Sequence, residues 1–394
     1  MSNSDEQDLT SRAMKSIESL CRIDSRTIAS PDGATEVSAV LGRELAAMGF
    51  ECRQVPCETT QERRGMHLVA TRNPGAGGKI VLLGHADTVL GPSEVPFRCD
   101  ASEGRVFGSG VCDMKGGLVL MVEAIRLVLA DEEIASRAEL AVVVNASEEA
   151  QTEHFGDLLR DTCRGARACL CFEGAYAAAD SAHILPNARK GIFRARLSCT
   201  GVSGHAGNNH PQGANAIREI ARKVEIIESL TDYDRNLTAN VGHISGGRCF
   251  NQIPDEASAD FEIRSFDPEL LQATKEELSD ALTRTTVRSA DDSAECNLSV
   301  TWSSGFRPFP RNEGTDDLLE RYTRIAEKEG FRVTAAPRGG ASDANFICNL
   351  VPALDGLGPV GGGMHSPAEW ADVRSFAARS KAAAGLIREL AKGD

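Results

Sequence analysis

Residues 80–91 read I-V-L-L-G-H-A-D-T-V-L-G, and residues 108–117 read G-S-G-V-C-D-M-K-G-G. The apolar run I-V-L-L predicts a strand that is buried on both faces of a parallel sheet. His85 and Asp87 follow this run and point the same way in an extended chain, because strand side chains alternate. A histidine whose ring is held by a carboxylate is a typical metal ligand. A further carboxylate, Asp113, lies in a glycine-flanked loop before an apolar helix.

Two more buried-strand patterns follow, and each leads into acidic residues. Residues 139–145 precede Ser147-Glu148-Glu149, and residues 168–172 precede Glu173. Alternation of strands and helices, with polar residues at the carboxyl ends of the strands, is typical of an open α/β sheet that binds its ligand beyond those ends. The sequence therefore predicts an α/β domain with a site at one edge of its sheet.

Nearer the N-terminus, amphipathic patterns predict helices over 8–24 and 35–49. Residues 66–72 and 79–83 predict two strands, and the glycine-rich turn 73–78 between them favours their pairing with each other.

The pattern changes near residue 190. An alternating strand is followed by a helical stretch, two further strands, a helix that begins at Asp267-Pro268, and a last strand. The order β-α-β-β-α-β predicts a ferredoxin-like α+β unit inserted into the α/β domain. We expect a catalytic domain formed by 1–189 and 307–394, and an inserted lid or dimerisation domain over 190–306.

Composition describes an ordinary globular protein. A hydrophobic content of 41% and a charged content of 25% are typical of such proteins. The length of 394 residues suffices for two domains. A net charge of −14 without a basic stripe argues against nucleic-acid binding. The N-terminus lacks the regions of a signal peptide, and no apolar run reaches transmembrane length, so we expect no membrane association. Twelve cysteines without a C-x-x-C pair predict reduced thiols and a cytoplasmic protein.

The polar residues at strand ends and in glycine-rich loops form one candidate constellation: His85, Asp87, Asp113, Glu148, Glu149, Glu173 and His365. Histidine nitrogens and carboxylate oxygens suit Zn²⁺ or a similar divalent ion. The set is too large for one tetrahedral ion and matches two ions, ~3.5–4 Å apart, that share a carboxylate. Of the two adjacent glutamates, one can ligate while the other accepts a proton from the attacking water. An E-E pair is often only a solvated acidic surface, but its place after three valines favours a site.

Six motifs occur in order: G-H-A-D-T, G-V-C-D-M-K-G-G, S-E-E, F-E-G, S-G-H-A-G and G-M-H-S-P. They resemble the motifs of the dinuclear zinc peptidase family that contains glutamate carboxypeptidase, acetylornithine deacetylase and succinyl-diaminopimelate desuccinylase. The resemblance runs from about residue 80 to residue 370. The stretches L-L-G-H-A-D-T-V, P-F-R and F-N-Q-I-P are most similar to the bacterial glutamate carboxypeptidases.

This resemblance implies two Zn²⁺ ions per chain, with Co²⁺ or Mn²⁺ as possible substitutes. It implies that His85 and Glu173 hold one ion, that Glu149 and His365 hold the other, and that Asp113 bridges them. Asp87 would orient His85, and Glu148 would act as general base and then as general acid.

Residues of the inserted domain also match the family. His205 resembles the histidine that reaches the neighbouring subunit's site and stabilises the oxyanion, which implies a homodimer through the inserted domain. Asn251, Arg264 and Arg307 fall where the family binds the substrate carboxylate and the reaction-centre oxygen, and arginine suits a carboxylate because it binds bidentately. For Arg264 an exposed strand charge is an equal alternative.

We therefore expect a zinc amidohydrolase that cleaves the amide of a small peptidyl- or N-acyl-amino acid with a free carboxylate, in the manner of glutamate carboxypeptidase. The alternatives are an N-acyl-amino-acid deacylase of the acetylornithine or succinyl-diaminopimelate type, and an inactive metal-binding homologue. One departure concerns the residues after Glu149: the family usually has Gly-Ser, whereas residues 150–156 read A-Q-T-E-H-F-G. This longer loop, with the titratable His154, predicts a different substrate choice. We expect His67, His183, His210 and His243 to be structural or to lie at the surface.

Overall fold

The computed structural model describes residues 3–58, 63–150, 154–303 and 305–393. The chain forms two compact units. The first contains Met1–Ala188, Arg311–Arg338 and Ser342–Asp394, and the second contains Arg189–Pro310 and Gly339–Ala341.

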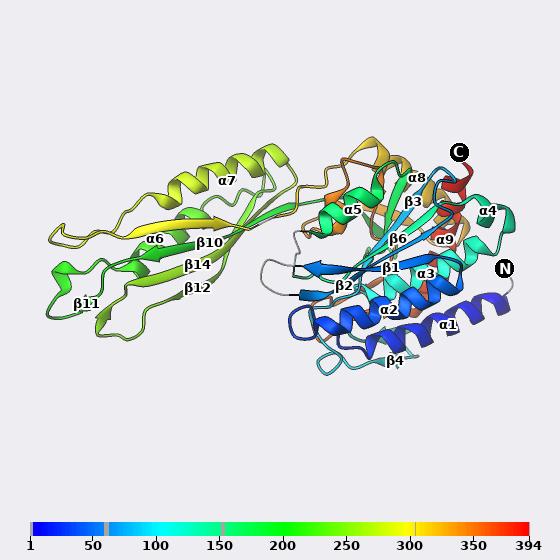
Figure 1. Cartoon of the computed structure of the whole chain (residues 1–394), viewed down its shortest axis with the longest axis horizontal. Coiled ribbons are helices and arrows are strands. Elements are labelled where there is room, and N and C mark those ends of the chain that lie inside the picture. Colours follow the sequence, from blue (N-terminus) through cyan, green and yellow to red (C-terminus); the bar gives the residue numbers. More distant parts are fainter. Residues whose placement is uncertain (1–2, 59–62, 151–153, 304, 394) are drawn as a thin grey trace. The chain divides into compact units, whose positions relative to one another are not determined.

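The first unit is built on a six-stranded sheet of order β1-β2-β6-β3-β7-β17 (Figure 1). Its strands are β1 (Glu51–Glu58), β2 (Arg63–Arg72), β3 (Ile80–His85), β6 (Leu140–Asn145), β7 (Ala168–Cys171) and β17 (Ala353–Leu354). Strands β6, β3, β7 and β17 run parallel, and β1 and β2 extend the sheet antiparallel. β3 and β6 are buried at every position, as their unbroken apolar runs predict.

The predicted pairing of residues 66–72 with 79–83 is wrong. β6 lies between β2 and β3 and pairs with both of them. The connecting turn contains Gly75, Gly77 and Gly78, all with positive φ, and it carries the chain past the position that β6 fills.

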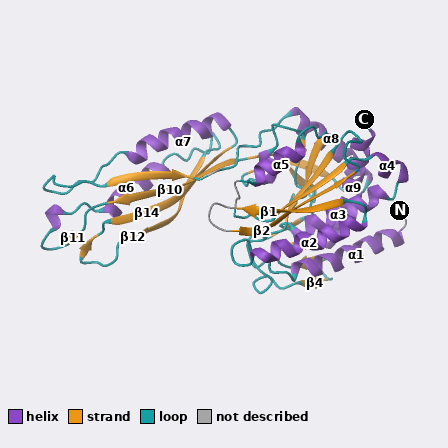
Figure 2. Cartoon of the chain, in the orientation of Figure 1, coloured by secondary structure: helices purple, strands orange, loops and turns teal. Residues whose placement is uncertain are grey.

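Helices cover both faces of this sheet (Figure 2). They are α1 (Asn3–Cys21), α2 (Pro31–Ala47), α3 (Lys115–Leu129), α4 (Glu132–Arg137), α5 (Phe155–Cys163), α8 (Glu313–Lys328) and α9 (Val373–Lys392). Ile80, Leu82 and Val142 point to one face of the sheet and share the main core with α1, α2, α3 and α9. The residues between them in each strand point to the opposite face, where α5 contacts β6. α3 begins at Lys115-Gly116-Gly117, where a Cβ on Gly117 would lie 1.9 Å from the Phe172 carbonyl oxygen. These glycines therefore let the helix start directly against the end of β7.

Shorter elements complete the first unit. A four-stranded sheet contains β18 (Gly361–Gly362), β19 (Trp370–Asp372), β5 (Arg105–Phe107) and β4 (Arg98–Asp100), in that order. A three-stranded sheet contains β16 (Val333–Arg338), β9 (His183–Arg189) and β8 (Tyr176–Ala177). The 3₁₀ turn η2 (Asp343–Phe346) contacts β3 and β7.

The second unit has the predicted β-α-β-β-α-β order: β10 (Gly191–Thr200), α6 (Ala216–Glu228), β12 (Thr238–Gly246), β14 (Glu256–Ser265), α7 (Pro268–Thr283) and β15 (Asn297–Trp302). The sheet order is β12-β14-β10-β15 with antiparallel neighbours. Both helices pack on the face that carries Leu197, Ala259 and Ile263. A small ribbon of β11 (Gly204–His205) and β13 (Gln252–Ile253) and the turn η1 (His210–Gln212) extend from the sheet. The predicted α/β fold with an inserted α+β unit is confirmed.

Within the described part of the chain, none of the helices is both long enough and apolar enough to cross a membrane.

Candidate metal centre

Three neighbouring parallel strands bring the predicted site together at their carboxyl ends. His85 is the last residue of β3, Glu148 and Glu149 follow β6, and Glu173 follows β7. Pairing of His85 with Asn145 in β6 aligns these ends at one edge of the sheet. Asp113 comes from the loop before α3, and His365 from the loop between β18 and β19.

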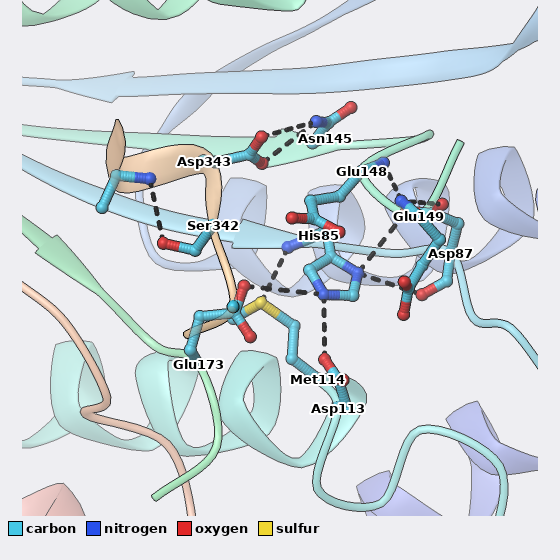
Figure 3. Close-up of polar contacts among 12 residues, drawn as sticks. His85, Asp87, Asp113, Met114, Asn145, Glu148, Glu149, Glu173, Ser342 and Asp343 are labelled. Atoms are coloured by element: carbon cyan, nitrogen blue, oxygen red, sulfur yellow. Dashed lines mark hydrogen bonds and ion pairs between the residues drawn. The ribbon is translucent and has the colours of Figure 1, made fainter. Parts of the chain in front are cut away.

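The ligand atoms form two groups that share Asp113. Figure 3 shows His85, Asp113 and Glu173 of the first group. In the first group, His85 Nε2 lies 3.1 Å from Asp113 Oδ1 and 3.7 Å from Glu173 Oε1. In the second, His365 Nε2 lies 3.2 Å from Asp113 Oδ2 and 3.2 Å from Glu149 Oε1. Asp113 thus presents one oxygen to each group, which is the arrangement of a bridging carboxylate.

Glu148 differs from Glu149 in its surroundings. It lies close enough to His85 and Glu149 to form a third, overlapping group with them, but among the described residues it shares no group with Asp113 or His365. Its side chain lies near His85 at the end of β6 (Figure 3).

Asp87 connects His85 to the glutamate turn. The Nδ1 atom of His85 donates to the backbone carbonyl of Asp87 at 3.0 Å and lies 3.4 Å from its Oδ1, which directs Nε2 toward the ligand groups. The Asp87 carboxylate accepts bonds from Thr27 Oγ1 at 2.6 Å and from the backbone N–H groups of Glu148 and Glu149, both at 3.0 Å. One residue therefore orients both a candidate ligand and the adjacent glutamates.

Four consecutive backbone N–H groups in this turn donate to side chains. Glu148 and Glu149 donate to Asp87, Ser147 donates to Asn145 Oδ1 at 3.0 Å, and Ala146 donates to His67 Nδ1 at 3.1 Å. Sequence reasoning missed that His67 and Asn145 hold this turn. A signal was present for Asn145, because it is the polar residue that ends a valine-rich strand. No sequence signal indicated His67.

Glu369 holds the loop of Asp113 in a similar way. Its buried carboxylate accepts from the backbone N–H groups of Gly110 at 3.0 Å, Cys112 at 2.9 Å and Asp113 at 2.9 Å. The peptide bond between Asp113 and Met114 is cis. No sequence signal indicated Glu369.

The electrostatics of the cluster favour a bound cation. Burial opposes a charge on His85, but the Glu173 carboxylate and hydrogen bonds to Asp113 and Asp87 outweigh it and raise the pKa of His85 well above its usual value. Hydrogen bonds to Asp113 and Glu149 raise the pKa of His365 to about 10. A divalent ion can replace the protons that the carboxylates hold on both imidazoles. The donor set of imidazole nitrogens and carboxylate oxygens therefore fits a divalent metal.

Burial also affects the two adjacent glutamates. It raises the pKa of Glu148 well above its usual value, and it raises that of Glu149 with a contribution from Asp113.

The candidates in the second unit fall into two separate groups. His205 and Asn251 lie together, because Ala206 N donates to the Asn251 carbonyl beside the β11–β13 ribbon. Arg264 lies at the opposite end of the sheet, where it pairs with Ile192 of β10. Ile192 also forms a β-bridge with Phe306, the residue before Arg307, so the two arginines lie at the same end. Since β10 extends over ten residues, the two groups are about 30 Å apart within one chain.

Their local contacts also differ. His205 is exposed, and its Nδ1 accepts from the N–H groups of Gly207 and Asn208, both at 3.1 Å, so Nε2 carries the proton of the neutral ring. Arg264 donates to Glu262 Oε1 at 2.6 Å and to the Gly339 carbonyl at 3.2 Å, and Arg307 is exposed.

The atypical loop after Glu149 is described in part. Residues 151–153 lie outside the described residues, and His154 is exposed at the start of α5.

Comparison with known proteins identifies relatives of the chain. Residues 81–389 match the model of peptidase family M20/M25/M40. Carboxypeptidase G2 of Pseudomonas sp. (strain RS-16) is 26% identical over 392 residues, covering 96% of this chain and 89% of that protein. A succinyl-diaminopimelate desuccinylase of Stenotrophomonas maltophilia (strain K279a) is 30% identical over 366 residues, covering 88% of this chain and 91% of that protein.

The fold is also that of a crystal structure from Bacillus subtilis, the YXEP protein, described as a dinuclear metal binding peptidase from the M20 family. The TM-score is 0.69 at 14% identity, with coverage of 98% of this chain and 99% of that one. From the family match and these relatives, the chain belongs to peptidase family M20/M25/M40 and is a metallopeptidase-type hydrolase.

Proposed function

We propose that the chain holds two divalent ions, Zn²⁺ in the first instance, and hydrolyses the amide bond of a peptidyl- or N-acyl-amino acid. The observation that carries this proposal is the sharing of Asp113, whose two oxygens face His85 and His365 separately. His85 and Glu173 would hold one ion, and Glu149 and His365 the other. Bound divalent ions would supply Lewis acidity at the scissile carbonyl and lower the pKa of water.

Glu148 is proposed as the general base and then the general acid. Burial raises its pKa, so its carboxylate has a high affinity for a proton at the place where water must be activated. The bonds from the turn to Asp87 and Asn145 fix its backbone while its carboxylate stays outside the two Asp113 groups. The presence of Glu148 with all five proposed ligands argues against an inactive homologue.

The proposed substrate has a free carboxylate, and its recognition is assigned to arginines of the second unit. Arg264 and Arg307 lie at the same end of the sheet in that unit, and a guanidinium binds a carboxylate bidentately. The favoured activity is that of a carboxypeptidase like the G2 relative. The second candidate is a deacylase, which the 30% identity to a desuccinylase favours.

Metal analysis combined with two variants tests the centre. We expect two ions per chain by elemental analysis, less metal in Glu149→Ala, and full metal in Glu148→Gln with turnover reduced by at least the ~10²–10⁴-fold that a general base contributes. No more than one ion in active protein, or a Glu148→Gln variant with a tenth of the wild-type rate, would contradict the proposal. Peptidyl- and N-acyl-amino acids, assayed with zinc-, cobalt- and manganese-loaded enzyme, separate the two candidate activities.

We further propose a homodimer through the second unit, with His205 completing the site of the partner. The separation of about 30 Å between His205 and Arg264 supports this assignment, because one chain's site cannot use both. Exposed apolar side chains near the ribbon also support it: Ile217 is 41%, Ile244 is 52% and Phe250 is 100% exposed.

Mixing two inactive variants tests the shared site. His205→Ala and Glu148→Gln homodimers should each be nearly inactive. After subunit exchange, half of the dimers are mixed and each has one intact site of two, so about a quarter of the wild-type activity should return. Verified exchange without recovery would contradict a role of His205 in the partner's site.

A further inference from the structure

A buried carboxylate outside the ligand groups lies beside the glutamate turn. Asp343 begins η2 and is 2% exposed. The Nδ2 atom of Asn145 donates to both of its oxygens, at 3.1 Å and 3.0 Å (Figure 3). Asn145 itself is 2% exposed. Burying two polar side chains costs free energy unless their hydrogen bonds are made. These hydrogen bonds therefore define the positions of the Asn145 and Asp343 side chains.

The other end of the Asn145 amide faces the turn. Its Oδ1 accepts from the N–H of Ser147, the residue before Glu148. If the amide were reversed, its NH₂ group would face the Ser147 N–H, and its oxygen would face the Asp343 carboxylate. Both contacts would then be repulsive. Asp343 therefore fixes the direction of the amide, and the amide fixes Ser147.

Asp343 is in turn anchored to the rest of the first unit. Ser342 Oγ accepts from Ala344 N, and Asn345 Oδ1 accepts from Ser342 N, which forms a capping box around Asp343. Ser342 Oγ also donates to the buried carboxylate of Asp355 at 2.7 Å. A series of contacts therefore connects Asp355 and η2, through Asp343 and Asn145, to the turn at Ser147.

We propose that Asp343 and Asn145 are positioning residues that set the direction in which Glu148 faces the reaction. This inference rests on the proposed role of Glu148. Neither residue belongs to the ligand groups, so their loss should reduce the rate of the chemical step without removing metal. Residues that orient a site from outside typically contribute about 10–100-fold when removed.

The test uses Asn145→Ala, Asp343→Leu, their double variant, and Asp343→Asn as the conservative replacement. Assays at pH 8.5 keep the Asp343 carboxylate ionised, because burial raises its pKa to about 7. Each of the first two variants should lower kcat about 10–100-fold, with KM and the metal content unchanged. The double variant should be no slower than the slower single variant, because both residues act through one contact. Asp343→Asn should retain most of kcat, since its amide oxygen can still accept from Asn145.

Hydrogen exchange of the peptide that contains Ser147 supplies a readout independent of activity. The Ser147 amide should exchange faster in Asn145→Ala and Asp343→Leu than in wild type. Asn297→Asp, an exposed position on β15, is the matched control and should change neither exchange nor kcat.

Three results would overturn the inference: a kcat of Asn145→Ala within twofold of wild type, multiplicative losses in the double variant, or loss of metal in the single variants. If Asp343→Leu fails to fold, Asn145→Ala and the Ser147 exchange still decide. A Glu148→Gln variant that stays active would instead show that the proposed base is wrong. An inactive Glu148→Gln variant beside a fully active Asn145→Ala variant would refute this inference alone.

Discussion

Glu369 offers a direct test of how the chain holds Asp113. Its side chain is nearly inaccessible, and its two oxygens accept three backbone N–H groups from Gly110, Cys112 and Asp113. Glu369→Ala removes all three acceptors. In Glu369→Gln the amide oxygen can still accept from the N–H groups of Cys112 and Asp113, but the NH₂ group then faces the Gly110 N–H.

The expected magnitudes follow from these bonds. Burial raises the pKa of Glu369 to about 7, so the magnitudes apply above that pH, where its carboxylate is ionised. A hydrogen bond to a charged group contributes about 1.5–3 kcal/mol. Loss of one bond in Glu369→Gln should lower the free energy of unfolding by about 1–3 kcal/mol. Loss of three in Glu369→Ala should lower it by about 3–5 kcal/mol, which is less than the full sum because water can enter the vacated volume. A loosened Asp113 should also weaken metal binding by about 10–100-fold.

Urea unfolding of the metal-free protein and calorimetric titration with Zn²⁺ measure the two effects. Glu133→Gln, whose side chain in wild type is 78% exposed on α4, is the control and should unfold within about 0.5 kcal/mol of wild type. If Glu369→Ala is no less stable than Glu369→Gln, or if both bind Zn²⁺ as tightly as wild type, Glu369 does not hold the loop as described.

Three further predictions concern other parts of the molecule. Asp113→Ala should lose metal from both groups, whereas Glu173→Ala should mainly lose one ion; equal losses by elemental analysis would contradict the bridging role. Burial lowers the pKa of His67 to about 4, so its contribution to stability is complete above about pH 6.5 and is lost as the pH falls through about 4. The contribution is about 3 kcal/mol. In urea unfolding, the free energy of unfolding should therefore fall less between pH 7 and pH 4.5 in His67→Gln than in wild type. Phe250→Asp should weaken the proposed dimer in sedimentation experiments, and an unchanged dimer would place the interface elsewhere.

The candidate ligands could be predicted because each has a local signature. His85 ends one short buried strand, Glu149 and Glu173 follow two others, and parallel strands bring their carboxyl ends to one edge. The β-α-β-β-α-β order of the second unit was equally readable, since β10, β14 and β15 alternate between a more exposed and a buried face. Both inferences needed only the pattern within an element and its place in the order.

The predicted pairing of β2 with β3 is wrong because strands that are neighbours in sequence need not be neighbours in the sheet. Residues 66–72 and 79–83 are separated by a short glycine-rich turn, which is typical of a hairpin. β6 comes more than fifty residues later and takes the position between them. Its unbroken apolar pattern suits a central strand with two neighbours, but a pattern of burial does not name the neighbours.

The side chains that hold the candidate ligand loops were missed for a related physical reason. Asp113 receives its support from Glu369, which is 256 residues away, and the turn after β6 receives part of its support from His67, 79 residues before Ala146. A side chain that accepts a backbone N–H leaves no periodic trace, because the donor can belong to any residue type. The ligand itself must be a histidine or a carboxylate, whereas its support needs only an acceptor at the right point in space. The first requirement is visible in a single sequence, and the second appears only when the chain is folded.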